Sequence, residues 1–299
     1  MSSVIEDTPK VELTSLDELW FQVSGTLCNL ECSHCFISCS PKNDSFGYLT
    51  LETVERTLAE AEPWGVKEYY FTGGEPFLNR EMVPIIETTL KHGPVTVLTN
   101  GTVLKREWLE RLQAAEDAST YGLEFRVSID GPTAEMNDPI RGAGTFNRAV
   151  KGVGLLVEYG FLPIITMTRT WSENDDVQIL NAFKAVLAEH GCTRPRLKVL
   201  PRLQIGAEEN RTCGYESYER ITPELMEDFD SNLLLCSHSR IVTDKGVYVC
   251  PILIESPDAK LGDTLAEAGG DFELSHGACY TCYQYGAICT NATSVKRHE

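Results

Sequence analysis

The pattern of apolar and polar residues along the chain predicts short strands that alternate with amphipathic helices. The first apolar segment, 19–24, partly alternates as a strand does, and Thr50 then caps a helix whose apolar residues recur at helical spacing. Further strands are predicted at 68–72, 95–99, 124–129, 164–167 and 197–200, and further helices at 82–90, 105–115, 146–159 and 176–190. Each predicted strand except the last, 197–200, is therefore followed by one of these helices.

This alternation predicts an α/β fold with a parallel sheet, because each helix returns the chain to the same edge. Six such units with right-handed crossovers would curl into a partial (βα)6 TIM-like barrel that stays open. The pattern breaks after Leu200, and the remaining chain is polar, turn-rich and rich in cysteine. We expect an N-terminal extension at 1–17, a barrel core at 18–205 and a small cysteine-rich C-terminal domain at 206–299.

Charge and hydropathy exclude several classes of partner. Lys and Arg number 26 against 44 Asp and Glu, which gives a net charge of −18. Such a surface repels phosphate backbones, so we expect no nucleic-acid partner, whereas a cationic substrate would be attracted. A simpler interpretation is that the negative charge only keeps the protein soluble. No apolar run is long enough to span a bilayer and the first residues show no secretory signal, so we expect a cytoplasmic protein without a membrane partner.

Eleven cysteines are the most unusual feature of the composition. An odd number without an export signal favours metal or catalytic use over a disulfide framework. Cys28, Cys32 and Cys35 lie on one loop after the first strand. Three thiolates in one loop can hold three corners of a cubane iron–sulfur cluster and leave the fourth iron open to a ligand. A zinc site that shares His34 or Cys39 is the alternative.

This loop resembles the C-x3-C-x-φ-C signature of the radical S-adenosylmethionine (SAM) superfamily, with His34 in the φ place. The ends of the following strands are similar to the family's motifs as well. They supply Gly73, Gly74 and Glu75 after the second strand, Asn100 after the third, Ser128 and Asp130 after the fourth, and Arg141 beyond it. The resemblance covers roughly residues 18–205.

The resemblance implies that Cys28, Cys32 and Cys35 ligate a [4Fe–4S] cluster whose fourth iron is chelated by SAM. It also implies a one-electron reductant of the flavodoxin or ferredoxin type and a 5′-deoxyadenosyl radical that abstracts hydrogen from carbon. The other motif residues would contact SAM: Gly73, Gly74 and Glu75 at its amino group, Asn100 beside it, Ser128 and Asp130 near its ribose and carboxylate, Arg141 on the carboxylate, and His34 as a wall beside the cluster.

The tail carries a second group of cysteines: Cys236, Cys250, Cys279, Cys282 and Cys289. A glycine turn before Cys250 suits a small hairpin that carries thiolates. This region resembles the SPASM/twitch extension, which implies a second, auxiliary [4Fe–4S] cluster. By family spacing Cys236, Cys250, Cys279 and Cys282 would ligate it. Alternatively, Cys289 takes the place of Cys250, whose free thiol would then return a hydrogen atom to a substrate radical. A structural zinc ribbon is a further alternative for this region.

SPASM/twitch relatives include modifiers of ribosomal peptides and small-molecule enzymes, such as the aminoglycoside epimerases and dehydrogenases of antibiotic biosynthesis. Peptide modifiers often carry an N-terminal recognition domain, whereas only about 17 residues precede the first strand here. Together with the negative charge, this predicts an epimerase or dehydrogenase, with epimerisation slightly favoured, that acts on a small cationic aminosugar-like substrate. A peptide or protein maturase is the alternative. A non-catalytic iron–sulfur or zinc protein is the alternative from another class.

Overall fold

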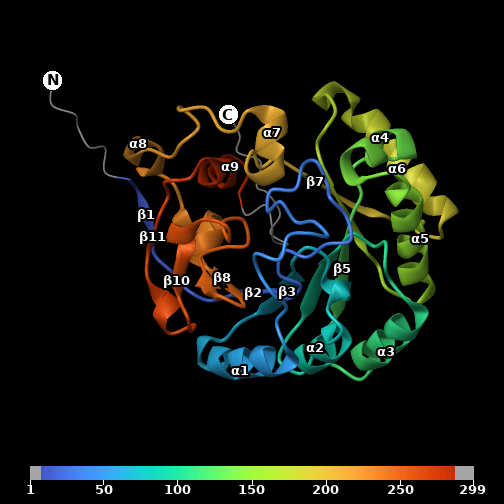
Figure 1. The fold of residues 1–299 in the computed structure, drawn as a ribbon, viewed down its shortest axis with the longest axis horizontal. Helices are drawn as coiled ribbons and strands as arrows, with labels where there is room; N and C mark the ends of the chain where they lie inside the picture. The colour runs from blue at the N-terminus through green and yellow to red at the C-terminus, as the bar shows by residue number, and fades with distance from the viewer. Residues whose placement is uncertain (1–7, 287–299) are drawn as a thin grey trace.

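The computed structural model describes residues 8–286, and a large, mostly parallel sheet lies at its centre (Figure 1). The strands are β1 (Lys10–Val11), β2 (Glu18–Gln22), β3 (Glu68–Thr72), β4 (Val95–Thr99), β5 (Leu123–Ser128), β6 (Ile164–Thr168), β7 (Arg196–Leu200), β8 (Ser239–Thr243), β9 (Gly246–Tyr248), β10 (Lys260–Gly262) and β11 (Phe272–Glu273). The nine strands of the large sheet follow the order β10-β9-β8-β2-β3-β4-β5-β6-β7. A small separate sheet pairs β1 with β11.

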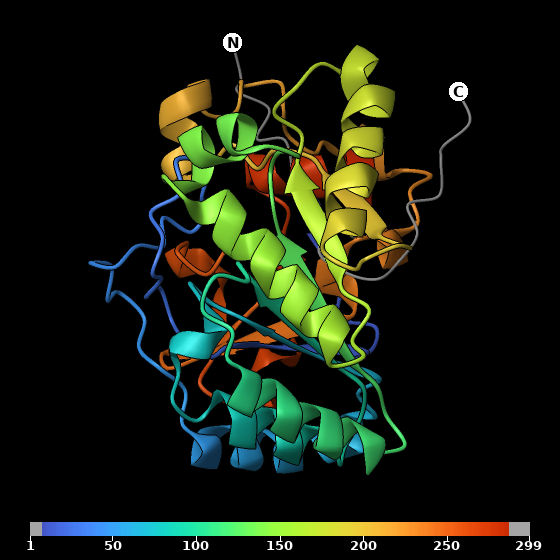
Figure 2. The ribbon, with the colours of Figure 1, turned by 90° about the vertical axis from the view of Figure 1, so that its right-hand side faces the viewer.

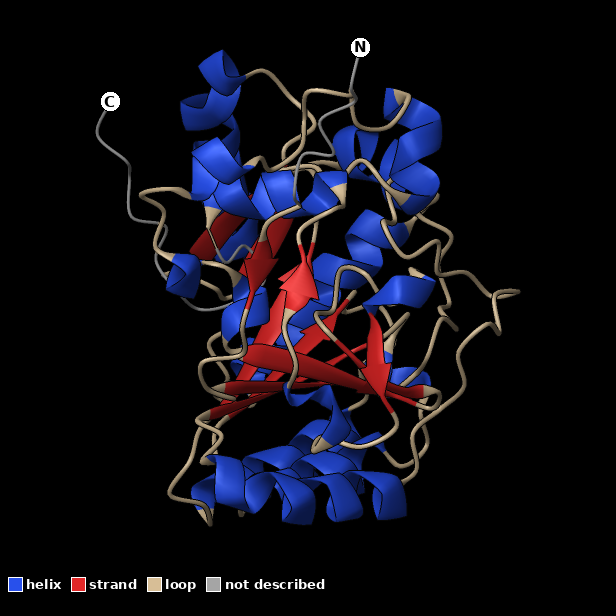
Figure 3. Ribbon diagram, turned by 90° about the vertical axis from the view of Figure 1, so that its left-hand side faces the viewer, coloured by secondary structure: helices blue, strands red, loops and turns tan. Residues whose placement is uncertain are grey.

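Helices cover the outer face of the sheet. They are α1 (Leu51–Ala61), α2 (Met82–Thr89), α3 (Arg106–Asp117), α4 (Ala134–Arg141), α5 (Thr145–Glu158) and α6 (Asp176–Glu189). Figure 1 shows α1, α2 and α3 along its lower edge and α4, α5 and α6 on its right, and Figure 2 shows α3 and α5 from their outer side. Seen from the opposite side, the strands lie above a layer of helices (Figure 3). The C-terminal part adds the shorter α7 (Glu209–Thr212), α8 (Pro223–Met226) and α9 (Gly277–Tyr285).

The two faces of the parallel strands differ in composition because successive side chains point to opposite faces. The outer face supplies Leu19, Phe21 and Phe71 to the core beneath the helices. On the inner face Trp20 stacks on Tyr70 with ring centroids 4.2 Å apart. The interior of the partial barrel is therefore filled by aromatic rings.

The predicted strands correspond to β2–β7, and the predicted helices to α1, α2, α3, α5 and α6. The α/β class and the partial barrel are thus confirmed. Helix α4 was not predicted, because the Asp130-Gly131-Pro132 turn before it and Pro139 inside it are typical of a loop. Every helix within residues 8–286 is too short or too polar to cross a bilayer.

The C-terminal strands extend the barrel sheet. Strand β8 pairs in parallel with β2, with Glu18 opposite Ser239, and β9 and β10 continue the sheet in antiparallel fashion. The expected hairpin is present: Gly246 has φ +118°, and a Cβ there would lie 2.4 Å from the carbonyl oxygen of Gly262. The polypeptide thus crosses the expected boundary near residue 205 and returns to the same sheet. The domain division itself stays a prediction.

Candidate active site

A cavity of about 220 Å³ lies where the carboxyl ends of the parallel strands meet. The last residues of β3 to β7 line it, which is the position of active sites in barrel folds. Most of the site residues that the sequence predicts line it as well: Cys28, Cys32, His34, Cys35, Gly73, Gly74, Asn100, Ser128 and Arg141. Glu75 and Asp130 are fully buried and are not part of its lining.

The cysteine loop, residues 23–49, links β2 to α1. Burial raises the pKa of Cys28 to about 12 and that of Cys32 to about 11. Hydrogen bonds from Cys39 lower the pKa of Cys35 to about 6, and the backbone N–H of Cys39 lies 3.3 Å from its sulfur. The loop therefore presents three thiols of unequal acidity to one cavity.

The donor set fits an iron–sulfur cluster. Cysteine thiolates are the ligands of [4Fe–4S] clusters, and each thiolate bonds a different iron, so the ligands surround the cluster and need not converge on one point. Cys28, Cys32 and Cys35 all line this cavity. Within residues 8–286, no three His, Cys, Asp or Glu side chains converge as they would around a single metal ion.

The loop after β3 packs directly against the cysteine loop, and this contact requires glycine. Gly73 has φ +144°, and a Cβ there would lie 2.2 Å from Ser24 Oγ. A Cβ on Gly74 would lie 2.0 Å from the carbonyl oxygen of Leu27. The backbone of this loop is therefore exposed to the cavity without side chains in the way.

Glu75 lies behind the cavity and joins two loops. Its carboxylate accepts hydrogen bonds from Thr99 Oγ1 at 2.8 Å, from the Asn100 N–H at 2.8 Å and from the Phe77 N–H at 3.1 Å. Burial outweighs these bonds and raises the pKa of Glu75 to about 7. In this structure the carboxylate holds the ends of β3 and β4 together and does not face the cavity.

Asn100 and Ser128 do face the cavity, each held by neighbouring polar groups. Asn100 Nδ2 donates to Asn29 Oδ1 at 2.9 Å and lies 3.8 Å from Cys28 Sγ. Ser128 Oγ is 3.2 Å from Thr166 Oγ1. Both side chains are thus positioned at the cavity wall by contacts to adjacent strands or to the cysteine loop.

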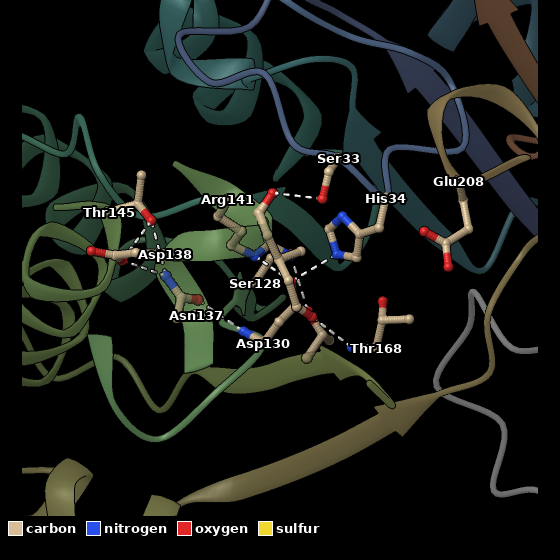
Figure 4. A network of polar contacts seen from close by, with 12 residues as sticks. Ser33, His34, Ser128, Asp130, Asn137, Asp138, Arg141, Thr145, Thr168 and Glu208 are labelled. Atoms are coloured by element: carbon tan, nitrogen blue, oxygen red, sulfur yellow. Dashed lines mark hydrogen bonds and ion pairs between the residues drawn. The ribbon is translucent and has the colours of Figure 1, made fainter. Parts of the chain in front are cut away.

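Asp130 is the centre of the largest polar network at the site (Figure 4). One oxygen accepts from Arg141 Nε at 2.5 Å and is 2.7 Å from His34 Nε2, and the other accepts from the Thr168 N–H at 2.7 Å. Burial opposes ionisation, but Arg141 and His34 together hold the pKa of Asp130 well below its ordinary value, and Asp130 raises the pKa of Arg141. One carboxylate thus joins the cysteine loop, α4 and the end of β6.

Four charged residues of the lining were not predicted: Arg126, Lys198, Arg202 and Glu208. Arg126 is 2% exposed and lies over the Tyr70 ring at 5.3 Å. With Arg141, the lining described by the structure contains four side chains that carry a positive charge and a single carboxylate, Glu208. The lining thus has more cationic than anionic side chains, although Asp130 pairs with Arg141 and Glu124 pairs with Arg126. The periodicity places Arg126 and Lys198 in strands but gives no signal that they share a cavity.

The tail cysteines gather around a second, smaller cavity of about 20 Å³. Cys236, Cys250, Cys279 and Cys282 all line it, in an otherwise apolar wall. Burial raises the pKa of Cys236 to about 12 and that of Cys250 to about 11, and it raises the pKa of Cys279 further. The four thiols come from three separate segments, so their convergence is a product of the tertiary fold.

Cys250 lines this second cavity and not the first. Cys289 lies outside the described residues, so the choice between Cys250 and Cys289 as a ligand stays open. The role of Cys250 as a hydrogen-atom donor stays a prediction. Its position among three other cysteines favours the alternative, that it ligates the auxiliary cluster.

Comparison with known proteins gives a family match. The model of the radical SAM superfamily matches residues 23–182. Mycofactocin maturase MftC of Mycobacterium tuberculosis is 32% identical over 312 aligned residues, which cover 90% of this chain and 76% of that protein. The antilisterial bacteriocin subtilosin biosynthesis protein AlbA of Bacillus subtilis is 31% identical over 157 residues, which cover 50% of this chain and 34% of AlbA.

A solved structure shares the fold. Streptococcus suis SuiB bound to S-adenosylmethionine superimposes with a TM-score of 0.62 at 18% sequence identity, over 84% of this chain and 64% of SuiB. The shared region thus includes the barrel and much of the C-terminal part. At this identity the likeness establishes the architecture alone.

Proposed function

Since the chain belongs to the radical SAM superfamily, whose enzymes use a [4Fe–4S] cluster and SAM, we propose that it is a maturase that abstracts a hydrogen atom from a carbon of a peptide substrate. The observation that carries this proposal is the likeness to a maturase, MftC, over 90% of the chain. AlbA, which is named for bacteriocin biosynthesis, is consistent with it. The peptide alternative is therefore preferred to the small aminosugar that composition favoured.

The charge of the cavity supports the same choice. The net charge of −18 describes the whole surface, whereas four cationic side chains and one carboxylate line the cavity. A polycationic aminosugar would find one carboxylate on the described lining, that of Glu208, and one of its oxygens already pairs with Arg211. A peptide backbone is neutral and carries both donors and acceptors. The interior thus accepts a peptide more readily than a polyamine.

We assign the SAM cluster to Cys28, Cys32 and Cys35, because their thiols line one cavity and thiolate is the donor that the cluster requires. When bound, the cluster and SAM supply a 5′-deoxyadenosyl radical, and this is the only chemistry that the protein itself cannot provide. The protein's own part is to bind, to orient and to exclude water. His34 contributes by its bond to Asp130, which fixes the cysteine loop.

The remaining lining residues would bind SAM. The exposed backbone of Gly73 and Gly74 suits the amino group, and the Arg141 guanidinium suits a carboxylate, with Asn100 and Ser128 as hydrogen-bonding groups between them. Glu75 and Asp130 act as positioning residues, because each is buried behind the wall and holds a residue that faces the cavity.

We assign an auxiliary cluster to Cys236, Cys250, Cys279 and Cys282, which surround the second cavity. This supports a SPASM/twitch-type region at 206–299 after a barrel core at 18–205, with β8 joining the two through β2. In this assignment Cys250 ligates the cluster and is not free to return a hydrogen atom to the substrate. The reaction would then be an oxidation of the peptide and not an epimerisation: the 5′-deoxyadenosyl radical would take one hydrogen atom, and the auxiliary cluster that these cysteines would hold would supply the acceptor for the remaining electron as a proton leaves.

The test uses anaerobically reconstituted protein with SAM, dithionite or a flavodoxin reductant, and a pool of short synthetic peptides. We expect 5′-deoxyadenosine together with a peptide that has lost two hydrogens, whereas epimerisation would leave the mass unchanged and incorporate deuterium from deuterated water. The Cys28→Ala variant should form neither product, and Cys213→Ala, which removes an exposed thiol, should match wild type. Modification of aminoglycosides but of no peptide would reject the proposal.

A further inference from the structure

The carboxylate of Glu208 has one oxygen without a partner. Glu208 ends the short helix η4 (Gly206–Glu208) that follows β7, and its side chain is 2% exposed. Oε2 pairs with Arg211 Nη1 at 2.8 Å, but Oε1 has no hydrogen-bond partner anywhere in residues 8–286. A buried acceptor that lacks a donor is destabilising unless a ligand supplies one.

Glu208 also faces the cavity of the proposed active site. Helix η4 is fixed to the cysteine loop, because the Ala207 N–H donates to the Cys35 carbonyl at 2.9 Å. Gly206 has φ +62°, and a Cβ there would lie 2.4 Å from the Phe36 carbonyl oxygen. Figure 4 draws Glu208 in the same region as the Asp130 network, with no polar contact to the residues shown. The fold therefore holds this carboxylate in place beside the cluster loop.

The chemistry of Glu208 selects its ligand. Arg211 can only donate, so it occupies one carboxylate oxygen and compensates its charge. The other oxygen can accept from an N–H or an O–H group. An ammonium group would bring a second positive charge to a carboxylate whose charge Arg211 already compensates, whereas a neutral amide N–H brings none. The pattern of charges thus favours a peptide amide.

We propose that Glu208 accepts a hydrogen bond from one backbone N–H of the peptide substrate and so determines which residue is presented to the radical. This inference rests on the proposed function and deepens it. It makes Glu208 a substrate-positioning residue of the known reaction class, supplied by the segment that joins the barrel to the C-terminal part.

The first test is Glu208→Gln, which keeps the size of the side chain. Since Arg211 only donates, the new amide oxygen turns toward it and the NH2 group faces the cavity. The NH2 group of the new Gln would then face the N–H group of the substrate, and two donors cannot form a hydrogen bond. We expect the peptide KM to rise about 10- to 100-fold, the range for a hydrogen bond to a charged group, with a smaller change in kcat. Glu209→Gln makes the same change at the next, exposed position and should keep the wild-type KM.

The second test begins with the wild-type enzyme. Peptide substrates methylated at one backbone nitrogen at a time are compared on the wild-type enzyme. One position should raise KM about 10- to 100-fold, and its methylation should cost little more in Glu208→Gln, because the contact is already lost. The dissociation constant of SAM, measured by equilibrium dialysis, and the iron content should match those of wild type.

Each other outcome overturns the proposal. Weaker SAM binding in Glu208→Gln would indicate that Glu208 Oε1 accepts a hydrogen bond from an N–H or O–H group of SAM and not from the peptide. Additive effects of methylation and substitution, or tolerance of methylation at every position, would show that Glu208 does not contact the backbone. If the wild-type enzyme modifies peptides but Glu208→Gln behaves as Glu209→Gln, the inference fails and the proposed function stands. If wild type modifies no peptide, both fail together.

Discussion

Replacing Asp130 by Asn removes the charge at the centre of the site network while keeping its shape. The carboxylate pairs with Arg141 at 2.5 Å and with His34 at 2.7 Å, and its side chain is fully buried. The side-chain amide of the new Asn has one acceptor oxygen and one donor nitrogen, so one of the groups that now donate to Asp130 would face an N–H group. Removing one member of a buried ion pair costs about 3–5 kcal/mol, because the other charge stays buried without a partner.

Thermal unfolding under anaerobic conditions measures this cost. A loss of about 3–5 kcal/mol lowers Tm by about 6–20 °C. The pKa of Asp130 is lower in the folded protein than in the unfolded chain. Its contribution to the free energy of unfolding is therefore complete above about pH 4, and it is lost only as the pH falls through the folded pKa. The loss in Asp130→Asn should therefore be equal at pH 8 and pH 9. Asp263→Asn, in an exposed pair with Lys260, is the matched control and should change Tm little. A loss below about 1 kcal/mol, or one that changes between pH 8 and pH 9, would refute this reasoning.

Three further substitutions test other parts of the structure. Burial raises the pKa of Glu18 to about 7, so the protonated carboxyl costs nothing below its unfolded pKa of 4.5, and stability is lost as the pH rises from 4.5 through 7. Glu18→Gln should therefore raise the free energy of unfolding at pH 8 by up to about 3 kcal/mol and leave it unchanged at pH 4, as measured by urea unfolding. Gly74→Ala should abolish SAM binding in a dialysis assay, because the Cβ would lie 2.0 Å from a backbone oxygen of the cysteine loop, while Gly122→Ala, with its nearest atom at 3.6 Å, should bind normally. Cys250→Ala should lower iron per reconstituted chain by about four if it ligates the auxiliary cluster, and Cys213→Ala should lose none; unchanged iron in Cys250→Ala would instead support its role as a free thiol.

The barrel core was predictable because its signals are local. Strand alternation and helical spacing are properties of short windows, and β2–β7 appear where those windows place them. The convergence of the cysteine loop with Gly73, Asn100 and Ser128 also follows from topology, since the ends of parallel strands meet at one edge.

The remaining features depend on contacts that no local pattern encodes. The pairing of β8 with β2 joins residues more than two hundred positions apart. The backbone hydrogen-bonding groups of either strand could pair with another strand instead. Whether Glu75 faces the cavity or lies behind it depends on the backbone of Asn100 and Phe77, which is fixed only in the folded state. Glu208 lies in a short helix without an apolar period, so its burial is set by the loop against which it packs.

The position of β2 connects the two cysteine centres. This strand lies between β3 and β8 and is therefore not an edge, so the cysteine loop that follows it is anchored from both the barrel and the C-terminal part. Cys28, Cys250 and Cys279 belong to one continuous apolar cluster. Because packed interiors transmit strain, a change that disorders the tail cavity should disturb the cysteine loop as well. The C-terminal part thus supports the geometry of the first cavity through β2, and through η4 it also contributes the carboxylate that we propose to position the substrate.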